Sequence, residues 1–162
     1  MPIPAILRLS PVSVRVMLPS TTDPIALPAS EKVTTPPLRV FIVENHADTL
    51  LYMQRYLEQM GNKVRVAPDM TTALGALPTA EIDLLISDIG LPDGDGWELM
   101  RQLGPNRTYM AIAMSGCGAN ADKARSRSVG YRHHLIKPFL PDELDPILEE
   151  ARKLAIARRA QS

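Results

Sequence analysis

Five short apolar runs constrain the fold of this chain more than any other feature. They cover residues 38–43, 63–67, 82–87, 108–114 and 131–136. Each run is too short for a stable helix, and the first, over 38–43, is rich in β-branched residues, which favours a buried strand. Because such runs are typical of strands that are covered on both faces, they predict a parallel sheet between two layers of helices.

Segments with helical periodicity separate these runs. Helices are expected over 48–60, 70–77, 96–103, 119–128 and 145–159. Gly61 is a typical stop for the first helix, Pro78 closes the second, and Asp145-Pro146 would form the cap and first turn of the last. The alternation of strands and helices predicts an α/β fold with a doubly wound, five-stranded parallel sheet.

The amino-terminal segment has a different composition, because more than half of the fifteen prolines lie in residues 1–37. Each proline removes a backbone donor and biases the preceding residue toward extended geometry, so no useful helix fits there. We predict a disordered Pro-rich tail over 1–37, a domain over 38–159 and a short tail over 160–162. A targeting peptide and a docking segment for a partner are alternative interpretations of 1–37.

Charge and cysteine content exclude several classes of protein. The chain has 18 basic and 18 acidic side chains, so it lacks the excess of positive charge that binding to nucleic acid requires. Its apolar runs are far shorter than the roughly 20 residues of a membrane-spanning helix. The single Cys117 cannot form an internal disulfide. We therefore expect a cytoplasmic protein with no nucleic-acid or membrane partner.

Polar residues follow four of the five predicted strands. Glu44-Asn45 follows the first strand, Asp88 the third, Ser115 the fourth and Lys137 the fifth. In open parallel sheets, ligands bind outside the carboxyl ends of the strands, near the point where the winding reverses. These side chains are therefore the candidate functional residues.

Four motifs in this order resemble the response-regulator receiver domains of two-component signalling. They are Glu44-Asn45, the segment DIGLPDGDG over 88–96, Ser115-Gly116 and Lys137-Pro138-Phe139. The resemblance covers about residues 38–158. It implies a flavodoxin-like sheet with strand order 2-1-3-4-5 and a phosphoacceptor site at the strand ends.

The resemblance assigns a role to each strand-end residue. Asp88 would attack the phosphoryl group of a phosphohistidine on a histidine kinase or phosphotransfer protein. Lys137 and Ser115 would each hold a phosphoryl oxygen. The cofactor would be Mg²⁺, held by Asp88, by Asn45, by Glu44 through water, and by the backbone carbonyl of Gly90.

Two positions depart from the family pattern. The second member of the acidic pair is Asn45, which offers an oxygen but no charge, and this should weaken Mg²⁺ binding. His134 stands three residues before Lys137, where receivers commonly have an aromatic residue that responds to the Ser/Thr. We expect Ser115 and His134 to form the switch; the alternative is that His134 is a polar strand residue without that role.

Only residues 160–162 follow the last predicted helix, so we expect a stand-alone receiver that signals to an unidentified downstream protein in a phosphorelay. A homodimer through the fourth helix, fifth strand and fifth helix is compatible with the resemblance. Beyond its own phosphotransfer and dephosphorylation, we expect no enzymatic activity. A phosphatase that uses an aspartyl nucleophile on a similar fold would need a second Asp at position 90, where this chain has Gly90. A flavin-binding protein is also disfavoured, because Glu44 after the first strand would repel the phosphate of the flavin. The remaining alternative is a pseudo-receiver that binds partners without being phosphorylated.

Overall fold

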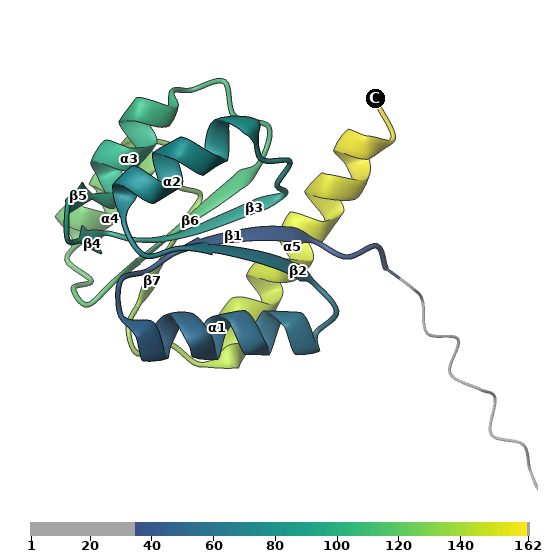
Figure 1. Cartoon of the computed structure of the whole chain (residues 1–162), viewed down its shortest axis with the longest axis horizontal. Coiled ribbons are helices and arrows are strands. Elements are labelled where there is room, and N and C mark those ends of the chain that lie inside the picture. Colours follow the sequence, from purple (N-terminus) through teal and green to yellow (C-terminus); the bar gives the residue numbers. More distant parts are fainter. Residues whose placement is uncertain (1–34, 162) are drawn as a thin grey trace, which may run out of the picture. The chain divides into compact units, whose positions relative to one another are not determined.

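A computed structural model describes residues 35–161 and contains one five-stranded sheet. Its strands are β1 (Arg39–Val43), β2 (Lys63–Ala67), β3 (Leu84–Asp88), β6 (Met110–Ser115) and β7 (His133–Ile136). All neighbours are parallel, in the order β2-β1-β3-β6-β7 (Figure 1). This is the doubly wound order 2-1-3-4-5 that the resemblance to receiver domains implied. The N-terminal part of the predicted tail, residues 1–34, lies outside the described residues.

Helices cover both faces of the sheet. They are α1 (Ala47–Gln59), α2 (Met70–Ala76), α3 (Gly96–Leu103), α4 (Asn120–Ser128) and α5 (Pro141–Arg159). In Figure 1, α1 and α5 lie on one face, and α2, α3 and α4 lie on the other. Among residues 35–161, no helix is both long enough and apolar enough to cross a membrane.

The strands supply side chains to two separate cores, because successive residues of a strand point to opposite faces. Val40 and Ile42 pack with residues of α1 and α5. Phe41 and Val43 pack with residues of α2 and α3. All four side chains are buried, so β1 is covered on both faces as its apolar sequence predicts.

Three local predictions were wrong. The last helix begins at Pro141 rather than at Asp145, and Pro146 lies inside it. The Glu143 carboxylate accepts a hydrogen bond from the Leu140 backbone N–H, which caps the helix one turn earlier than expected. Pro78 does not close α2 directly, since a 3-10 turn over Leu77–Thr79 follows that helix.

The third difference lies in the loop after β3, between the strand predicted over 82–87 and the helix predicted over 96–103, where no further strand was predicted. It contains a two-stranded antiparallel hairpin, β4 (Gly90–Leu91) and β5 (Gly94–Asp95). The Asp93 carboxylate at its tip accepts hydrogen bonds from the backbone N–H groups of Met70 and Thr71, both at 2.8 Å. The hairpin is thereby attached to the first turn of α2.

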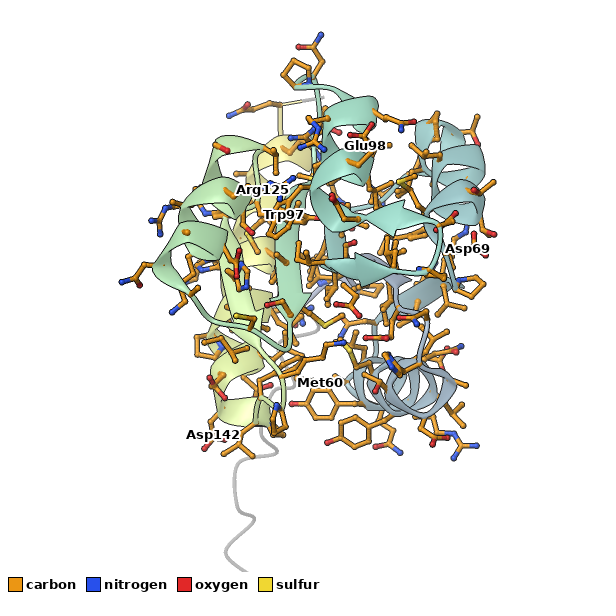
Figure 2. The ribbon with its side chains drawn as sticks, turned by 90° about the vertical axis from the view of Figure 1, so that its left-hand side faces the viewer. Met60, Asp69, Trp97, Glu98, Arg125 and Asp142 are labelled. Atoms are coloured by element: carbon orange, nitrogen blue, oxygen red, sulfur yellow. The ribbon has the colours of Figure 1, made fainter. Side chains whose placement is uncertain are left out.

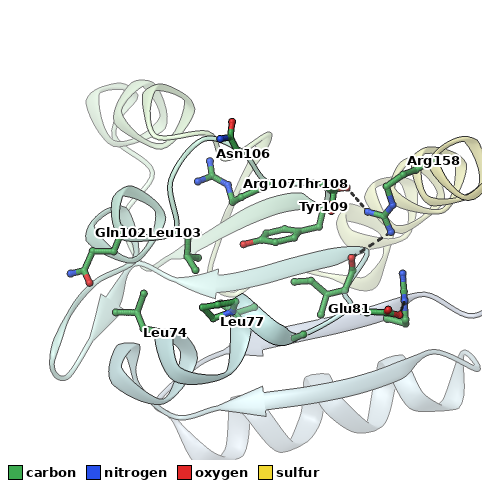
Figure 3. Close-up of a pocket in the computed structure, with 14 residues that line it drawn as sticks. Leu74, Leu77, Glu81, Gln102, Leu103, Asn106, Arg107, Thr108, Tyr109 and Arg158 are labelled. Carbon is green, nitrogen blue, oxygen red and sulfur yellow. Dashed lines mark hydrogen bonds and ion pairs between the residues drawn. The ribbon is translucent and has the colours of Figure 1, made fainter. Parts of the chain in front are cut away.

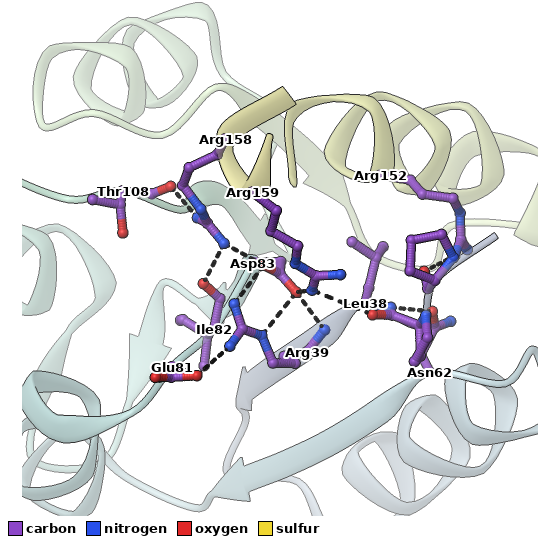
Figure 4. A network of polar contacts seen from close by, with 12 residues as sticks. Leu38, Arg39, Asn62, Glu81, Ile82, Asp83, Thr108, Arg152, Arg158 and Arg159 are labelled. Atoms are coloured by element: carbon purple, nitrogen blue, oxygen red, sulfur yellow. Dashed lines mark hydrogen bonds and ion pairs between the residues drawn. The ribbon is translucent and has the colours of Figure 1, made fainter. Parts of the chain in front are cut away.

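The buried carboxylate of Asp83 organises the amino ends of the strands (Figure 4). It accepts hydrogen bonds from the backbone N–H of Arg39 at 2.9 Å and from its Nε at 3.1 Å. Arg158 and Arg159 of α5 bind the same carboxylate. Burial would raise the pKa of Asp83, but Arg39 foremost, together with Arg159, holds the pKa below its ordinary value. The cluster joins β1 and α5 to the residue that precedes β3.

Candidate functional site

The strand register brings the predicted site residues to one edge of the sheet. Val43 pairs with Ser87, and Asp88 pairs with Met114. Ser115 pairs with Ile136. Glu44, Asp88, Ser115 and Lys137 each stand at, or directly after, one of these paired strand ends. The strand register therefore places these residues together at the carboxyl edge of the sheet, as predicted.

Lys137 links the two buried carboxylates of this edge. Its Nζ lies 2.8 Å from Oδ2 of Asp88 and 2.8 Å from Oε2 of Glu44. The side chain of Glu44 is 0% exposed and that of Asp88 is 5% exposed. Two carboxylates at such depth need a positive charge between them, because burial of unpaired charge is strongly unfavourable.

The electrostatic balance of this group is set by competing effects. Burial alone would raise the pKa of Glu44, but hydrogen bonds from Lys137 and His46 outweigh it and lower the pKa. Burial opposes the charge of Lys137, yet hydrogen bonds to Asp88 and Glu44 raise its pKa. At neutral pH, Glu44 is therefore an anion and Lys137 a cation.

His46 is the residue of this site that the sequence did not reveal. Its backbone N–H and its Nδ1 both lie 2.9 Å from Oε1 of Glu44. Ligand atoms of Glu44, His46 and Asp88 lie within 4.8 Å of one another. The predicted metal ligand Asn45 has an exposed side chain. The only sequence signal for His46 is its position two residues after Glu44, within reach of a local hydrogen bond between side chain and backbone.

The donor set fits a magnesium ion. The carboxylate oxygens of Glu44 and Asp88 are hard ligands that converge on one positive charge, and Mg²⁺ keeps several waters beside one or two carboxylates. The backbone N–H of Gly90 donates to Oδ1 of Asp88 at 3.2 Å, and the predicted role of the Gly90 carbonyl as a metal ligand stays a prediction.

The loop after Asp88 packs closely against it. A Cβ at Gly96 would lie 2.6 Å from the backbone oxygen of Asp88, so only glycine fits there. The Gly96 carbonyl accepts a hydrogen bond from the buried Tyr131 hydroxyl at 2.8 Å. The loop is thereby anchored to the residues before β7.

Ser115 and His134 are in direct contact. The Ser115 Oγ lies 3.0 Å from Nε2 of His134. It also accepts the Cys117 backbone N–H at 3.1 Å and donates to the Cys117 carbonyl. The two predicted switch residues are thus hydrogen-bonded neighbours, Ser115 on β6 and His134 on β7.

A cavity of about 720 Å³ lies at the other end of the sheet (Figure 3). Arg39 and Arg158 line it beside the Tyr109 ring. Both arginines bind Asp83, and Arg39 also binds Glu81. Their charges are compensated within the protein, so the candidate site remains the carboxyl edge.

Comparison with known proteins identifies the family to which a doubly wound sheet with these strand-end residues belongs. Residues 40–149 match the family model of the response regulator receiver domain, and the chain belongs to that family.

Two curated relatives illustrate the match. The chain is 32% identical over 114 residues to an uncharacterised 14.6 kDa protein of Leptolyngbya boryana, covering 68% of this chain and 87% of that protein. It is 34% identical over 112 residues to the KDP operon transcriptional regulatory protein KdpE of Escherichia coli, covering 69% of this chain and 50% of KdpE. It spans about half the length of several other curated relatives.

Solved structures show the same fold. A CheY-like response regulator receiver domain protein from Methanospirillum hungatei superposes with a TM-score of 0.69 at 24% identity, over 75% of this chain and 99% of that one. The BeF3-activated receiver domain of DrrB superposes with a TM-score of 0.66 at 18% identity, over 73% of this chain and 99% of that one.

Proposed function

We propose that this receiver accepts a phosphoryl group on Asp88 from a phosphohistidine of a histidine kinase or phosphotransfer protein, and that it signals by binding another protein. The observation that carries the proposal is the position of Lys137 Nζ, 2.8 Å from both Asp88 and Glu44. A carboxylate that attacks a phosphoryl group brings anion onto anion, and a fixed cation beside it offsets that repulsion.

The proposed step is a displacement at phosphorus. An oxygen of Asp88 bonds to phosphorus, the P–N bond of the phosphohistidine breaks, and the departing imidazole nitrogen keeps the bonding pair and takes up a proton from solvent. Lys137 then exchanges its contact with Asp88 for one with a phosphoryl oxygen. The Ser115 hydroxyl donates to another oxygen.

Glu44, Asp88 and the amide oxygen of Asn45 are the proposed holders of Mg²⁺, which supplies further positive charge to the phosphoryl oxygens when bound. With one carboxylate fewer than an acidic pair would give, we expect weaker Mg²⁺ binding. We further propose that the chemistry of this protein is confined to its own acyl phosphate, which forms on Asp88 and is hydrolysed there.

Fluorine NMR of beryllofluoride, a mimic of the phosphoryl group, tests this proposal on the full chain. We expect a bound signal that requires Mg²⁺ and disappears in Asp88→Asn. Asp93→Asn is the matched control, because it removes a carboxylate from the same loop while its amide can still accept hydrogen bonds at α2. Absence of any Mg²⁺-dependent signal would refute the phosphoacceptor role and favour a constitutive binding module.

A further inference from the structure

A chain of hydrogen bonds runs from Ser115 away from the site into the helices of one face. His134 Nδ1 lies 2.8 Å from Oγ of Ser126 on α4. The Ser126 Oγ in turn accepts the indole N–H of Trp97 on α3 at 2.9 Å. Three elements of the fold, β7, α4 and α3, are thereby joined to the strand-end serine.

The chemistry of these groups assigns a direction to every bond. An indole N–H can only donate, so Ser126 Oγ accepts from Trp97. Ser126 is 1% exposed. Within residues 35–161, the acceptor in reach of its hydroxyl hydrogen is Nδ1 of His134. A buried hydroxyl needs that acceptor. Nδ1 therefore carries no proton, and the ring is the neutral Nε2–H tautomer that donates to Ser115.

The same reasoning shows that Ser115 is fully used in this state. Its oxygen accepts from His134 and from the Cys117 N–H, and its hydrogen goes to the Cys117 carbonyl. A phosphoryl oxygen on Asp88 can take this hydrogen only if Ser115 releases that carbonyl. Rotation of the hydroxyl also turns the lone pairs of Oγ, and it therefore alters the hydrogen bond that Oγ accepts from His134.

The neutral ring agrees with its surroundings. Burial lowers the pKa of His134, and Lys123 of α4 acts in the same direction, against the Cys117 backbone and Asp122. Arg125 of α4 and Asp95 at the start of α3 lie 3.8 Å apart and compensate each other.

Helix α4 is held against the rest of the fold in part by the two hydrogen bonds of Ser126. Ser126 is its one buried residue, so apolar packing contributes little to holding the helix. A second contact joins it to α3, where the Arg125 guanidinium stacks 3.9 Å above the Trp97 ring (Figure 2). Both contacts involve Trp97, the only tryptophan of the chain.

We propose that His134 is a positioning residue that orients the Ser115 hydroxyl and, through Ser126, transmits its state to Trp97 and to α4. This inference rests on the proposed function, because Ser115 matters only if a phosphoryl group reaches Asp88. The proposed coupling differs from a switch in which an aromatic ring only moves into or out of a space. It requires hydrogen bonds at both nitrogens of an imidazole and a serine on α4.

Nitrogen NMR of the full chain without ligand tests the coupling first. We expect His134 as the neutral Nε2–H tautomer near neutral pH. Ser115→Ala should shift the Trp97 indole N–H resonance, and this shift should be lost in the His134→Phe background. His133→Phe is the matched control, because His133 binds Glu150 instead, and the shift should persist there.

Two conservative variants separate the two nitrogens of the ring. His134→Gln places an amide near the Nε2 position, and His134→Asn places one near Nδ1. Each variant keeps only one of the two hydrogen bonds of His134, so neither should restore the full Trp97 shift that Ser115→Ala causes. An Nδ1–H tautomer, or a Ser115→Ala shift that persists undiminished in the folded His134→Phe variant, would overturn the proposal.

Beryllofluoride separates this inference from the proposed function. If the fluorine signal shows binding, the Trp97 indole resonance should move in the wild type and stay in place in His134→Phe and Ser126→Ala. Binding without movement of Trp97 in the wild type would refute the coupling and leave the phosphoacceptor role intact. Absence of binding would refute the phosphoacceptor role. The nitrogen NMR measurement without ligand would still decide whether the hydrogen bonds of His134 and Ser126 couple Ser115 to Trp97.

Discussion

Replacement of Lys137 by methionine tests the electrostatics of the site directly. The side chain of Lys137 is 21% exposed and bridges carboxylates that are 0% and 5% exposed. Lys137→Met keeps most of the aliphatic length and removes the charge. Glu44 and Asp88 would then face each other at depth without a cation, and the folded state should be destabilised.

The structure sets the size of this effect. Loss of one partner from a fully buried ion pair destabilises a protein by roughly 3–5 kcal/mol. Lys137 is partly in contact with water, and the emptied site can admit solvent, so we expect about 2–4 kcal/mol near neutral pH. Urea denaturation followed by circular dichroism measures this difference in the free energy of unfolding.

The dependence on pH has a defined sign. In the wild type the pKa of Glu44 is lowered, so this group contributes stability above its unfolded pKa and loses it as the pH falls through the folded value. Without Lys137, burial dominates and the pKa of Glu44 rises. The variant then gains from protonation on acidification, and its deficit should shrink between about pH 7 and about pH 5.

Magnesium provides a second check on the same variant. A divalent cation held by Glu44 and Asp88 would replace the missing charge, so millimolar Mg²⁺ should stabilise Lys137→Met more than the wild type. Lys153→Met is the control, because Lys153 is exposed on α5. A deficit no larger than about 0.5 kcal/mol, as for ordinary surface substitutions, or one that widens on acidification, would refute the reasoning.

Three further substitutions test the frame around the site. Asp93→Ala removes the acceptor at the first turn of α2, so we expect faster amide exchange at Met70 in a hydrogen-exchange measurement. Asp83→Asn should destabilise the fold by about 3 kcal/mol near pH 7. Because the pKa of Asp83 is lowered in the folded state, that deficit should begin to shrink in urea titrations as the pH falls below about 4, the ordinary pKa of an unfolded aspartate. It should disappear only below the lowered pKa of the folded protein, where the wild-type carboxylate is protonated too. Tyr131→Phe removes a buried hydrogen bond to Gly96 and should lower the unfolding free energy by about 1 kcal/mol in the same titrations.

The sheet was predictable because its determinants are local. Residues 84–86 of the third run and 110–114 of the fourth are apolar throughout, and such segments favour a covered strand. Parallel order then places every strand end on one edge, which is why Glu44, Asp88 and Lys137 could be grouped before any distance was known. Strand bounds shifted by one or two residues, as frayed strand ends allow.

The contacts between helices could not be predicted in the same way. Ser126 lies in a weakly apolar segment, and nothing in its spacing marks it as a partner of His134 or Trp97. Its burial depends on how α4 packs against α3, which is a property of the tertiary structure. The same holds for Asp93, whose partners lie 22 and 23 residues earlier in the chain.

The replacement of an acid by Asn45 has two opposite consequences for the proposed chemistry. Glu44 and Asp88 carry two negative charges and Lys137 one positive charge, so these three residues leave a net charge of minus one. A further carboxylate would double that charge, which would strengthen the attraction for Mg²⁺ but also the repulsion of an incoming phosphoryl group. With Asn45, a bound Mg²⁺ would make the pocket net positive. Under the proposed function, the substitution would therefore weaken the attraction of the empty site for metal and would favour the phosphoryl anion once metal is bound.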